Sequence, residues 1–195
     1  MKISDSVRKS IDDWEKNELE SSMLHACNAV DGTAKKIYPK YKNQKRFTQI
    51  LRDNYKIFGP MGLPGIDIAN TAFPVGIKNP TAIGGNPDVA DIIYSIHRCS
   101  HGHGDELPDG FSLLEDAKFG GDSTRIHIER GKLRLSDRSI FGLLAVAVFL
   151  IANKDQLDSK LNGYRLIFGG EIEFLINEWW GRGEDFLKII KLHTP

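Results

Sequence analysis

Hydrophobic residues recur every three or four positions over two stretches near the start of the chain, residues 10–37 and 47–58. Neither stretch contains a proline or a run of β-branched residues, and such spacing is typical of amphipathic helices. Pro39 ends the first pattern and Gly59-Pro60 ends the second, because proline disfavours helical backbone at the residue before it. The two stretches therefore predict an antiparallel pair of helices.

Residues 59–86 show no comparable period. They hold six glycines and four prolines in 28 residues, a composition typical of turns and extended loops. Their glycines do not form a phosphate-binding loop, because Lys78 is neither preceded by glycine nor followed by Ser or Thr. We predict an extended surface loop, and loops of this length in compact domains are usually functional or mobile.

A third helix is predicted from Asn86-Pro87, where an N-cap residue precedes a proline suited to the first helical position. Its apolar stripe consists of Val89, Ile92, Ile93, Ile96 and Cys99. Gly102 and Gly104 then weaken the helical pattern. The polar segment 97–103 is therefore expected on the last turn of this helix or just beyond it.

The second half of the chain mixes strand-like and helical patterns. Apolar and polar residues alternate at about 124–136, which predicts a β-hairpin. Ser136 or Asp137 is placed to cap a buried helix that runs to about Asn153. A strand is predicted at 164–168, and the residues after it read as two short helices.

Together these elements predict one mainly α domain that covers residues 1–195. Its core is expected to be an up-and-down helical bundle built from about residues 10–58 and 86–153. The β-hairpin at about 124–136 is a small insertion in this bundle, and residues 160–195 form a C-terminal helical extension.

The composition is typical of a soluble globular protein, with 41% hydrophobic and 27% charged residues. The longest apolar run, residues 140–152, is too short to cross a bilayer. The charged N-terminal segment lacks the apolar core of a signal peptide, and the two cysteines form no CxxC pair. We therefore expect a cytoplasmic location, no membrane partner, no cofactor and no metal.

Charge is unevenly distributed although the formal net charge is zero. Residues 33–56 carry eight positive side chains against one negative, and four aromatic residues lie among them. Cations can bind phosphates and aromatic rings can stack on bases, so this segment is a candidate site for RNA. The predicted RNA-binding residues are Lys35, Lys36, Lys42 and Arg46. The alternative is a helical hairpin whose lysines only keep the surface hydrated.

Three histidines, an arginine and a cysteine crowd into residues 97–103. His97, His101 and His103 could together hold zinc, although the chain has no HExxH motif. A second interpretation is a helix end with exposed polar residues. In this interpretation Arg98 pairs with the acidic segment 101–116, which has five acidic residues and no Lys or Arg. A third is a catalytic pair formed by Arg98 and His103.

Arg98 and His103 carry complementary chemistry. The guanidinium presents a fixed fork to a phosphate, and the imidazole can move protons near neutral pH. Together they could cleave a phosphodiester without a metal, by deprotonating a 2′-hydroxyl and holding the developing charge. On an ideal helix two residues five positions apart point about 140° from each other. A break at Gly102, or pairing with a second copy of the chain, would relax this constraint.

The segment IIYSIHRCSHGH, an apolar helix that ends in Arg-x4-His, resembles the HEPN family of helical domains. The stretches LHACNAVDGTAKKIY and RFTQILRDNYKIFG are similar to the leading helical hairpin of bacterial HEPN proteins. The likeness covers roughly residues 10–58 and 86–104. Outside it lie the hairpin and residues 160–195.

The resemblance implies a homodimer with a shared active site and metal-independent RNA cleavage, in a toxin–antitoxin or phage-defence setting. It also implies that Arg98 holds the scissile phosphate and that His103 is the general base or acid. Many members have a polar residue after the arginine, where this chain has Cys99. Ser100 and His101 are candidates for the missing polar contact.

Three functional hypotheses follow from these observations. The first is a metal-independent endoribonuclease that uses Arg98 and His103, with a regulatory protein such as an antitoxin as a further partner. The second is a non-catalytic module that binds RNA, a nucleotide or a protein, which Cys99 favours. The third is a metalloenzyme built on His97, His101 and His103.

Overall fold

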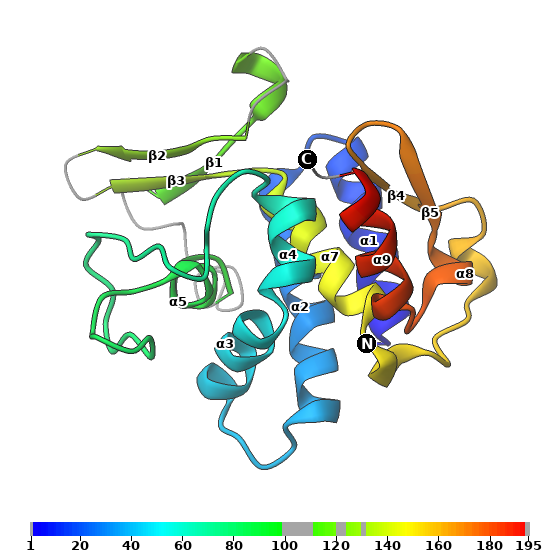
Figure 1. Cartoon of the computed structure of the whole chain (residues 1–195), viewed down its shortest axis with the longest axis horizontal. Coiled ribbons are helices and arrows are strands. Elements are labelled where there is room, and N and C mark those ends of the chain that lie inside the picture. Colours follow the sequence, from blue (N-terminus) through cyan, green and yellow to red (C-terminus); the bar gives the residue numbers. More distant parts are fainter. Residues whose placement is uncertain (1, 99–110, 120–123, 130–131, 194–195) are drawn as a thin grey trace.

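The computed structural model describes residues 2–98, 111–119, 124–129 and 132–193, and within these ranges the chain is mainly helical with a small β part (Figure 1). The α-helices are α1 Ile3–Glu15, α2 Leu19–Ile37, α3 Asn43–Asp53, α4 Tyr55–Gly62, α5 Val89–Ile92, α7 Ser139–Phe149, α8 Ile176–Trp179 and α9 Gly183–His193. The other helical turns are the π-helix η1 Ile93–Arg98 and the 3-10 turns η2 Asp116–Phe119, η3 Ile151–Asn153 and η4 Ser159–Leu161. The strands are β1 Phe111–Leu114, β2 Ile126–Glu129, β3 Lys132–Ser136, β4 Arg165–Phe168 and β5 Ile172–Leu175.

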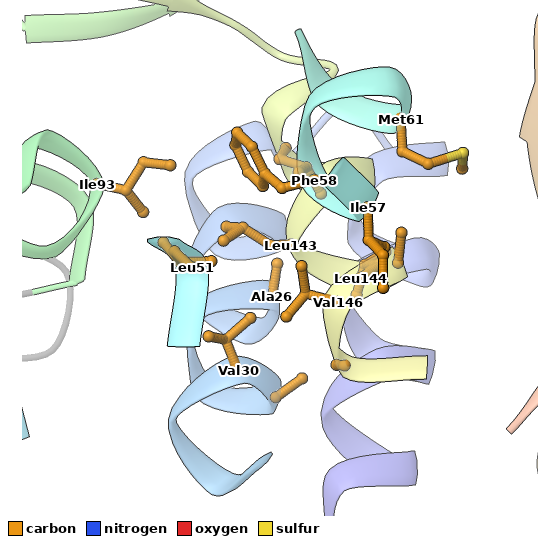
Figure 2. Close-up of a cluster of buried hydrophobic side chains, with 14 of the residues drawn as sticks. Ala26, Val30, Leu51, Ile57, Phe58, Met61, Ile93, Leu143, Leu144 and Val146 are labelled. Carbon is orange, nitrogen blue, oxygen red and sulfur yellow. The ribbon is translucent and has the colours of Figure 1, made fainter. Parts of the chain in front are cut away.

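The hydrophobic core lies around α7, whose residues are all buried except Phe141. Figure 2 shows side chains of α2, α3, α4 and α7 meeting there, among them Ala26, Val30, Leu51, Phe58, Leu143 and Val146. The contact between α4 and α7 depends on Gly142, because a Cβ at that position would come within 2.8 Å of the Phe58 ring and 2.9 Å of its carbonyl oxygen. The buried helix predicted from the apolar run is therefore confirmed as the centre of the fold.

The N-terminal helix prediction is wrong at its start. Instead of one helix from about residue 10, the chain forms α1 and α2 with a break at Asn17, whose φ is 63°. Asparagine adopts this left-handed conformation more readily than most residues other than glycine. The two helices pack antiparallel, and the hydroxyls of Ser10 and Ser22 each donate to the other residue's carbonyl at 2.8 and 2.7 Å.

The predicted helix at 47–58 is also divided, into α3 and α4. The break falls at Asn54, whose side-chain amide donates to the Ile50 carbonyl at 2.8 Å and so competes with the helical backbone bonds. Pro60 was expected to end the helix, but α4 contains it and continues to Gly62. Only the backbone bond that proline cannot donate is lost there.

The segment between α4 and α5 has no regular secondary structure, as predicted, but it is more than a surface loop. Ile68, Phe73 and Val75 are buried in the main hydrophobic cluster. The predicted cap at Asn86-Pro87 is wrong by two residues. The N-cap is Asp88, whose carboxylate accepts a bond from the Asp91 backbone N–H at 3.0 Å.

The predicted β-hairpin is confirmed as antiparallel β2 and β3, but it belongs to a three-stranded sheet. The third strand, β1, runs parallel to β3, with Phe111 opposite Leu133 and Leu114 opposite Ser136. The strand β1 was not predicted, because its four residues carry little strand signal of their own. The expected caps of α7 are wrong too, since its N-cap is Arg138, whose side chain does not cap the helix. The helix α7 ends at Phe149, and η3 follows it.

The C-terminal region differs from the prediction in one element. The strand β4 is confirmed, but residues 172–175, expected to be helical, form β5 in an antiparallel pair with β4. The turn between the strands places Gly169 and Gly170 at positive φ, 62° and 79°, a conformation that favours glycine. The helices α8 and α9 then follow, as expected from the glycines at 181 and 183. None of the helices in the described ranges has the length and apolar character needed to cross a membrane.

Candidate nucleic-acid interface

The predicted catalytic residues lie at the edge of what the structure describes. Arg98 is the last residue of η1, while Ser100, His101 and His103 lie outside the described residues. The same holds for two of the three histidines in the zinc hypothesis. The structure therefore describes the helix that leads into the Arg-x4-His motif but not the residues of the motif after Arg98.

The helix that carries Arg98 changes type just before the motif. It begins as the α-helix α5 and widens into the π-helix η1 over its last six residues. The predicted apolar stripe is confirmed for Val89, Ile92, Ile93 and Ile96, which are all buried, while its last member, Cys99, lies outside the described residues. The η1 segment packs against α2 and α3, and the Tyr94 ring lies 5.5 Å from the ring of Phe47 in α3. Single π-helical turns are rare and occur frequently at functional sites.

A buried ion pair fixes the start of α5. The guanidinium of Arg52 in α3 donates to Asp88 at 2.7 and 3.0 Å and forms a salt bridge with Asp91 at 3.0 Å. Burial alone would raise the pKa of Asp88, but the bonds from Arg52, the Asp91 backbone N–H and Tyr55, together with the Arg52 charge, outweigh burial and hold that pKa below its ordinary value. The hydroxyl of Tyr55 donates to the same carboxylate at 3.0 Å.

Asp91 connects this ion pair to the loop before α5. Its side chain is fully buried and accepts bonds from the backbone N–H groups of Thr81 and Ala82, each at 2.9 Å. The Thr81 hydroxyl adds a third bond at 2.7 Å. Sequence reasoning missed this network. Its signal was a carboxylate within the apolar segment VADII, since a buried charge requires partners.

Aromatic and basic side chains gather at the turn between α2 and α3, which forms one end of the molecule (Figure 1). The rings of Tyr38 and Tyr41 stack with centroids 5.4 Å apart and planes 8° apart. The Lys45 ammonium lies 4.4 Å above the Tyr41 ring. The Tyr38 hydroxyl donates to Asp53, and burial together with this bond raises the pKa of Tyr38. We call residues 35–45 the α2–α3 tip.

The four predicted RNA-binding residues divide into two pairs. Lys35 and Lys42 are exposed at the α2–α3 tip, as are Lys40 and Lys45. Lys36 instead turns toward the segment after α7 and donates to the Asn153 side chain at 2.8 Å. Arg46 forms a salt bridge with Asp31 at 3.0 Å. The exposed charge therefore comes from lysines around the stacked tyrosines.

Comparison with known proteins places the chain in a family. The model of the Rv1289 family matches residues 2–195. This chain belongs to the Rv1289 family. It is 38% identical over 194 residues to Rv1289 and MT1327 of Mycobacterium tuberculosis and to Mb1320 of Mycobacterium bovis. Each alignment covers 97% of this chain and 88% of the relative. No solved structure matches the chain.

The assignment to the HEPN family is therefore wrong. The family model that matches almost the whole chain is that of Rv1289, whereas the resemblance to HEPN proteins depended on a short Arg-x4-His spacing and two amphipathic helices. Amphipathic helices with similar spacing arise in many unrelated helical proteins, since the pattern reflects burial of one face. The chemistry of Arg98 and His103 must be judged without the family argument.

Proposed function

We propose that the protein binds single-stranded RNA at the α2–α3 tip. The observation that carries this proposal is the stacked pair Tyr38 and Tyr41 surrounded by exposed lysines. Single strands bind to proteins by stacking bases on aromatic rings while cations contact the phosphates. Single-stranded RNA is favoured over duplex RNA, because the unstacked bases of a single strand can reach the tyrosine rings and the paired bases of a duplex cannot.

The charges around the tip support an anionic ligand. Two carboxylates of the helices that carry the tip, Asp31 and Asp53, are already bound by Arg46 and Tyr38. Lys35, Lys40, Lys42 and Lys45 are exposed. The ammonium of Lys45 covers Tyr41, and it could move onto a phosphate when a base takes its place on the ring.

Fluorescence anisotropy with a labelled single-stranded RNA tests the proposal. Tyr41→Ala should weaken binding by about 1–3 kcal/mol, the range for one stacked base, and the double variant Lys42→Gln, Lys45→Gln should weaken it further. Lys191→Gln in α9, a charge change far along the chain, is the matched control and should bind as the wild type does. If the tip variants bind RNA as tightly as this control, the α2–α3 tip is not the site.

Metal-independent RNA cleavage is a second candidate function, favoured by the π-helical turn that ends on Arg98. In this mechanism Arg98 holds the scissile phosphate and His103 takes the proton of the 2′-hydroxyl. The 2′-oxygen then bonds to phosphorus and closes the 2′,3′-cyclic phosphate, while the bond from phosphorus to the 5′-oxygen breaks and the 5′-oxygen leaves as a hydroxyl by taking up a proton. Ser100 and His101 would supply further polar contacts. The turn packs on α2 and α3, the two helices that carry the tip, so an RNA bound there could extend toward Arg98.

Cleavage is tested with labelled RNA in excess EDTA, comparing the wild type with Arg98→Ala and His103→Ala. Cutting that leaves 2′,3′-cyclic phosphate ends and is lost in both variants supports the catalytic pair. Activity that appears only with added zinc would instead favour His97, His101 and His103 as ligands. Binding at the tip without any cutting would leave a non-catalytic RNA-binding module.

Two further expectations concern partners. A homodimer would place two copies of the motif opposite each other, and an antitoxin or other regulatory protein would restrain a ribonuclease in a toxin–antitoxin or phage-defence setting. Light scattering of the purified protein gives the oligomeric state directly. A monomeric mass together with active cleavage would remove the shared active site from the mechanism.

A further inference from the structure

An open cavity of about 710 Å³ lies between the start of α1, the end of α2 and the segment that follows α7. Figure 1 shows the N-terminus of the chain beside that segment. The cavity is lined by Lys2, Ile3, Ser4, Asp5, Gly32, Lys36, Asp155, Gln156, Leu157, Asp158, Ser159 and Lys160. Its volume falls within the range of about 300–1,000 Å³ typical of small-molecule sites. Of the lysines in the α2–α3 tip, Lys36 lines the cavity, whereas Lys35, Lys40, Lys42 and Lys45 do not.

Lys36 is the most firmly placed cation of this cavity. Its ammonium donates to the Asn153 side-chain oxygen at 2.8 Å and to the Ala152 carbonyl at 3.2 Å. Asn153 is fully buried and is itself fixed, because its amide donates to Thr33 and to the Ala147 carbonyl, each at 2.8 Å. Both partners of Lys36 are neutral oxygens, so they orient the ammonium without neutralising it. One of its three donors remains for a ligand.

The three carboxylates that line the cavity differ in whether they already accept hydrogen bonds. Asp158 is occupied, since it accepts the Ser4 hydroxyl at 3.0 Å and the Lys160 backbone N–H at 3.0 Å. These bonds hold the pKa of Asp158 below its ordinary value. The remaining carboxylates on the wall are Asp5 and Asp155, and the other ammonium groups are those of Lys2 and Lys160.

We propose that this cavity binds a ribose 5-phosphate unit, as found in a mononucleotide. Lys36 and Lys160 would contact the phosphate, and the carboxylates of Asp5 and Asp155 would accept bonds from the ribose hydroxyls. A site with one oriented ammonium, that of Lys36, further lysines and additional carboxylates matches a ligand that carries both an anion and hydroxyl donors. The ligand is either a free mononucleotide or the 5′-terminal nucleotide of an RNA strand, since both present the same group.

This inference goes beyond RNA binding at the α2–α3 tip, and adjacent lysines allow the two sites to be tested separately. Lys36 lines the cavity, whereas Lys35 is exposed at the tip and does not line it. Lys36→Met and Lys160→Gln are the cavity variants, and Lys35→Gln is the matched control. Thermal melting of each variant establishes that it is folded, and Lys160→Gln alters a residue outside the buried Asn153 network.

Calorimetric titration with adenosine monophosphate, ribose 5-phosphate and adenosine provides the readout. Both phosphates should bind, adenosine should not, and each cavity variant should lose about tenfold or more in affinity, as expected for a lost charged hydrogen bond. Lys35→Gln should bind the phosphates as the wild type does. Absence of phosphate binding at millimolar concentration would overturn the proposal, as would phosphate affinities of Lys36→Met and Lys160→Gln equal to that of the wild type.

The source of the ligand is separated by two RNA oligonucleotides that differ only in a 5′-phosphate. If the wild type prefers the phosphorylated strand and Lys36→Met loses this preference, the cavity holds the end of a strand. If the two strands bind equally while adenosine monophosphate binds, the ligand is a free nucleotide. Failure of the tip variants to weaken RNA binding, with nucleotide binding intact, would contradict only the proposed function.

Discussion

Arg52 and Asp91 form a salt bridge of 3.0 Å in which the Asp91 side chain has no solvent exposure. The pair connects α3 to the helix that carries Arg98, and through Thr81 it also holds the preceding loop. A carboxylate this deeply buried is stable as an ion only because every approach to it is occupied by a donor. The network therefore fixes the start of α5, the helix that continues into η1.

Asp91→Ala should destabilise the protein by about 3–5 kcal/mol. It breaks the salt bridge between Arg52 and a fully buried carboxylate, and it leaves the backbone N–H groups of Thr81 and Ala82 without their acceptor. Urea unfolding followed by circular dichroism measures this loss. Asp53→Ala in the same helix as Arg52 is a matched control, since Asp53 is exposed and its loss should cost much less. A change of under about 1 kcal/mol for Asp91→Ala would mean that the network contributes little to stability.

The sequence predicted the elements whose burial pattern is local and missed those that depend on distant partners. The apolar run predicts α7 and the alternation of apolar and polar residues predicts β2 and β3, and each pattern can be recognised from a short stretch of sequence. The strand β1 pairs with β3 across an intervening segment, and nothing in its own four residues indicates a parallel partner. The break at Asn17 depends on a backbone conformation that several residue types tolerate, so composition alone did not locate it.

The candidate site was predictable to a similar degree. The cluster of lysines and tyrosines was visible in the sequence, and it does lie at one turn. Which basic side chains are bound by other elements was not predictable, because Asn153 binds Lys36 and Asp31 binds Arg46, and the sequence does not show these pairings. The cavity proposed to bind ribose 5-phosphate has walls from α1 and from the segment after α7. These two segments lie far apart in the sequence, and only the fold brings them together.

Asp137 should make stability decrease as the pH rises through its folded pKa. Burial raises the pKa of this carboxyl, the nearby Asp116 adds to the effect, and bonds from the Asp116 and Arg138 backbone N–H groups only partly oppose it. The pKa of Asp137 is higher in the folded state than in the unfolded state, so protonation of this carboxyl stabilises the folded state at low pH. This stabilisation is lost as the pH rises through the folded pKa. The pH range in which stability falls begins near the pKa of an aspartate in the unfolded chain, about 4.

Asp137→Asn tests this assignment. The amide oxygen can still accept the bond from the Asp116 backbone N–H, but it carries no charge at any pH. Free energies of unfolding measured from pH 3.5 to pH 7 should show the wild type losing stability relative to the variant as the pH rises. Parallel profiles for the two proteins would contradict a raised pKa. Arg138 and Asp116, which share the region through a 3.4 Å contact, are unchanged in both.

Gly142→Ala should destabilise the contact between α4 and α7. The added Cβ would lie 2.8 Å from the Phe58 ring and 2.9 Å from its carbonyl oxygen, and backbone cannot yield as the end of a flexible side chain can. Forcing extra volume into a packed core typically costs about 1–3 kcal/mol. Gly76→Ala is the control, because nothing lies within 4 Å of its Cβ position. Equal melting temperatures for the two variants would show that the helices can move apart freely.

The salt dependence of RNA binding should separate the lysines of the α2–α3 tip from its tyrosines. Each phosphate contact made with a single strand contributes about −0.7 to the slope of log affinity against log salt concentration. Lys42→Gln should therefore make the slope shallower by about that amount, whereas Tyr41→Ala should lower affinity at every salt concentration and leave the slope unchanged. Stacking on a ring releases no counterions, so the two effects differ in kind.

Tyr41→Phe is the matched variant for this measurement, because it keeps the ring that stacks on Tyr38 and removes only the hydroxyl. It should bind RNA nearly as the wild type does, with the same slope. A slope that changes in Tyr41→Ala as much as in Lys42→Gln would indicate that Tyr41 acts by positioning Lys45, whose ammonium lies 4.4 Å above its ring. In that case the base would not stack on Tyr41, and the tip would bind RNA through its phosphates alone.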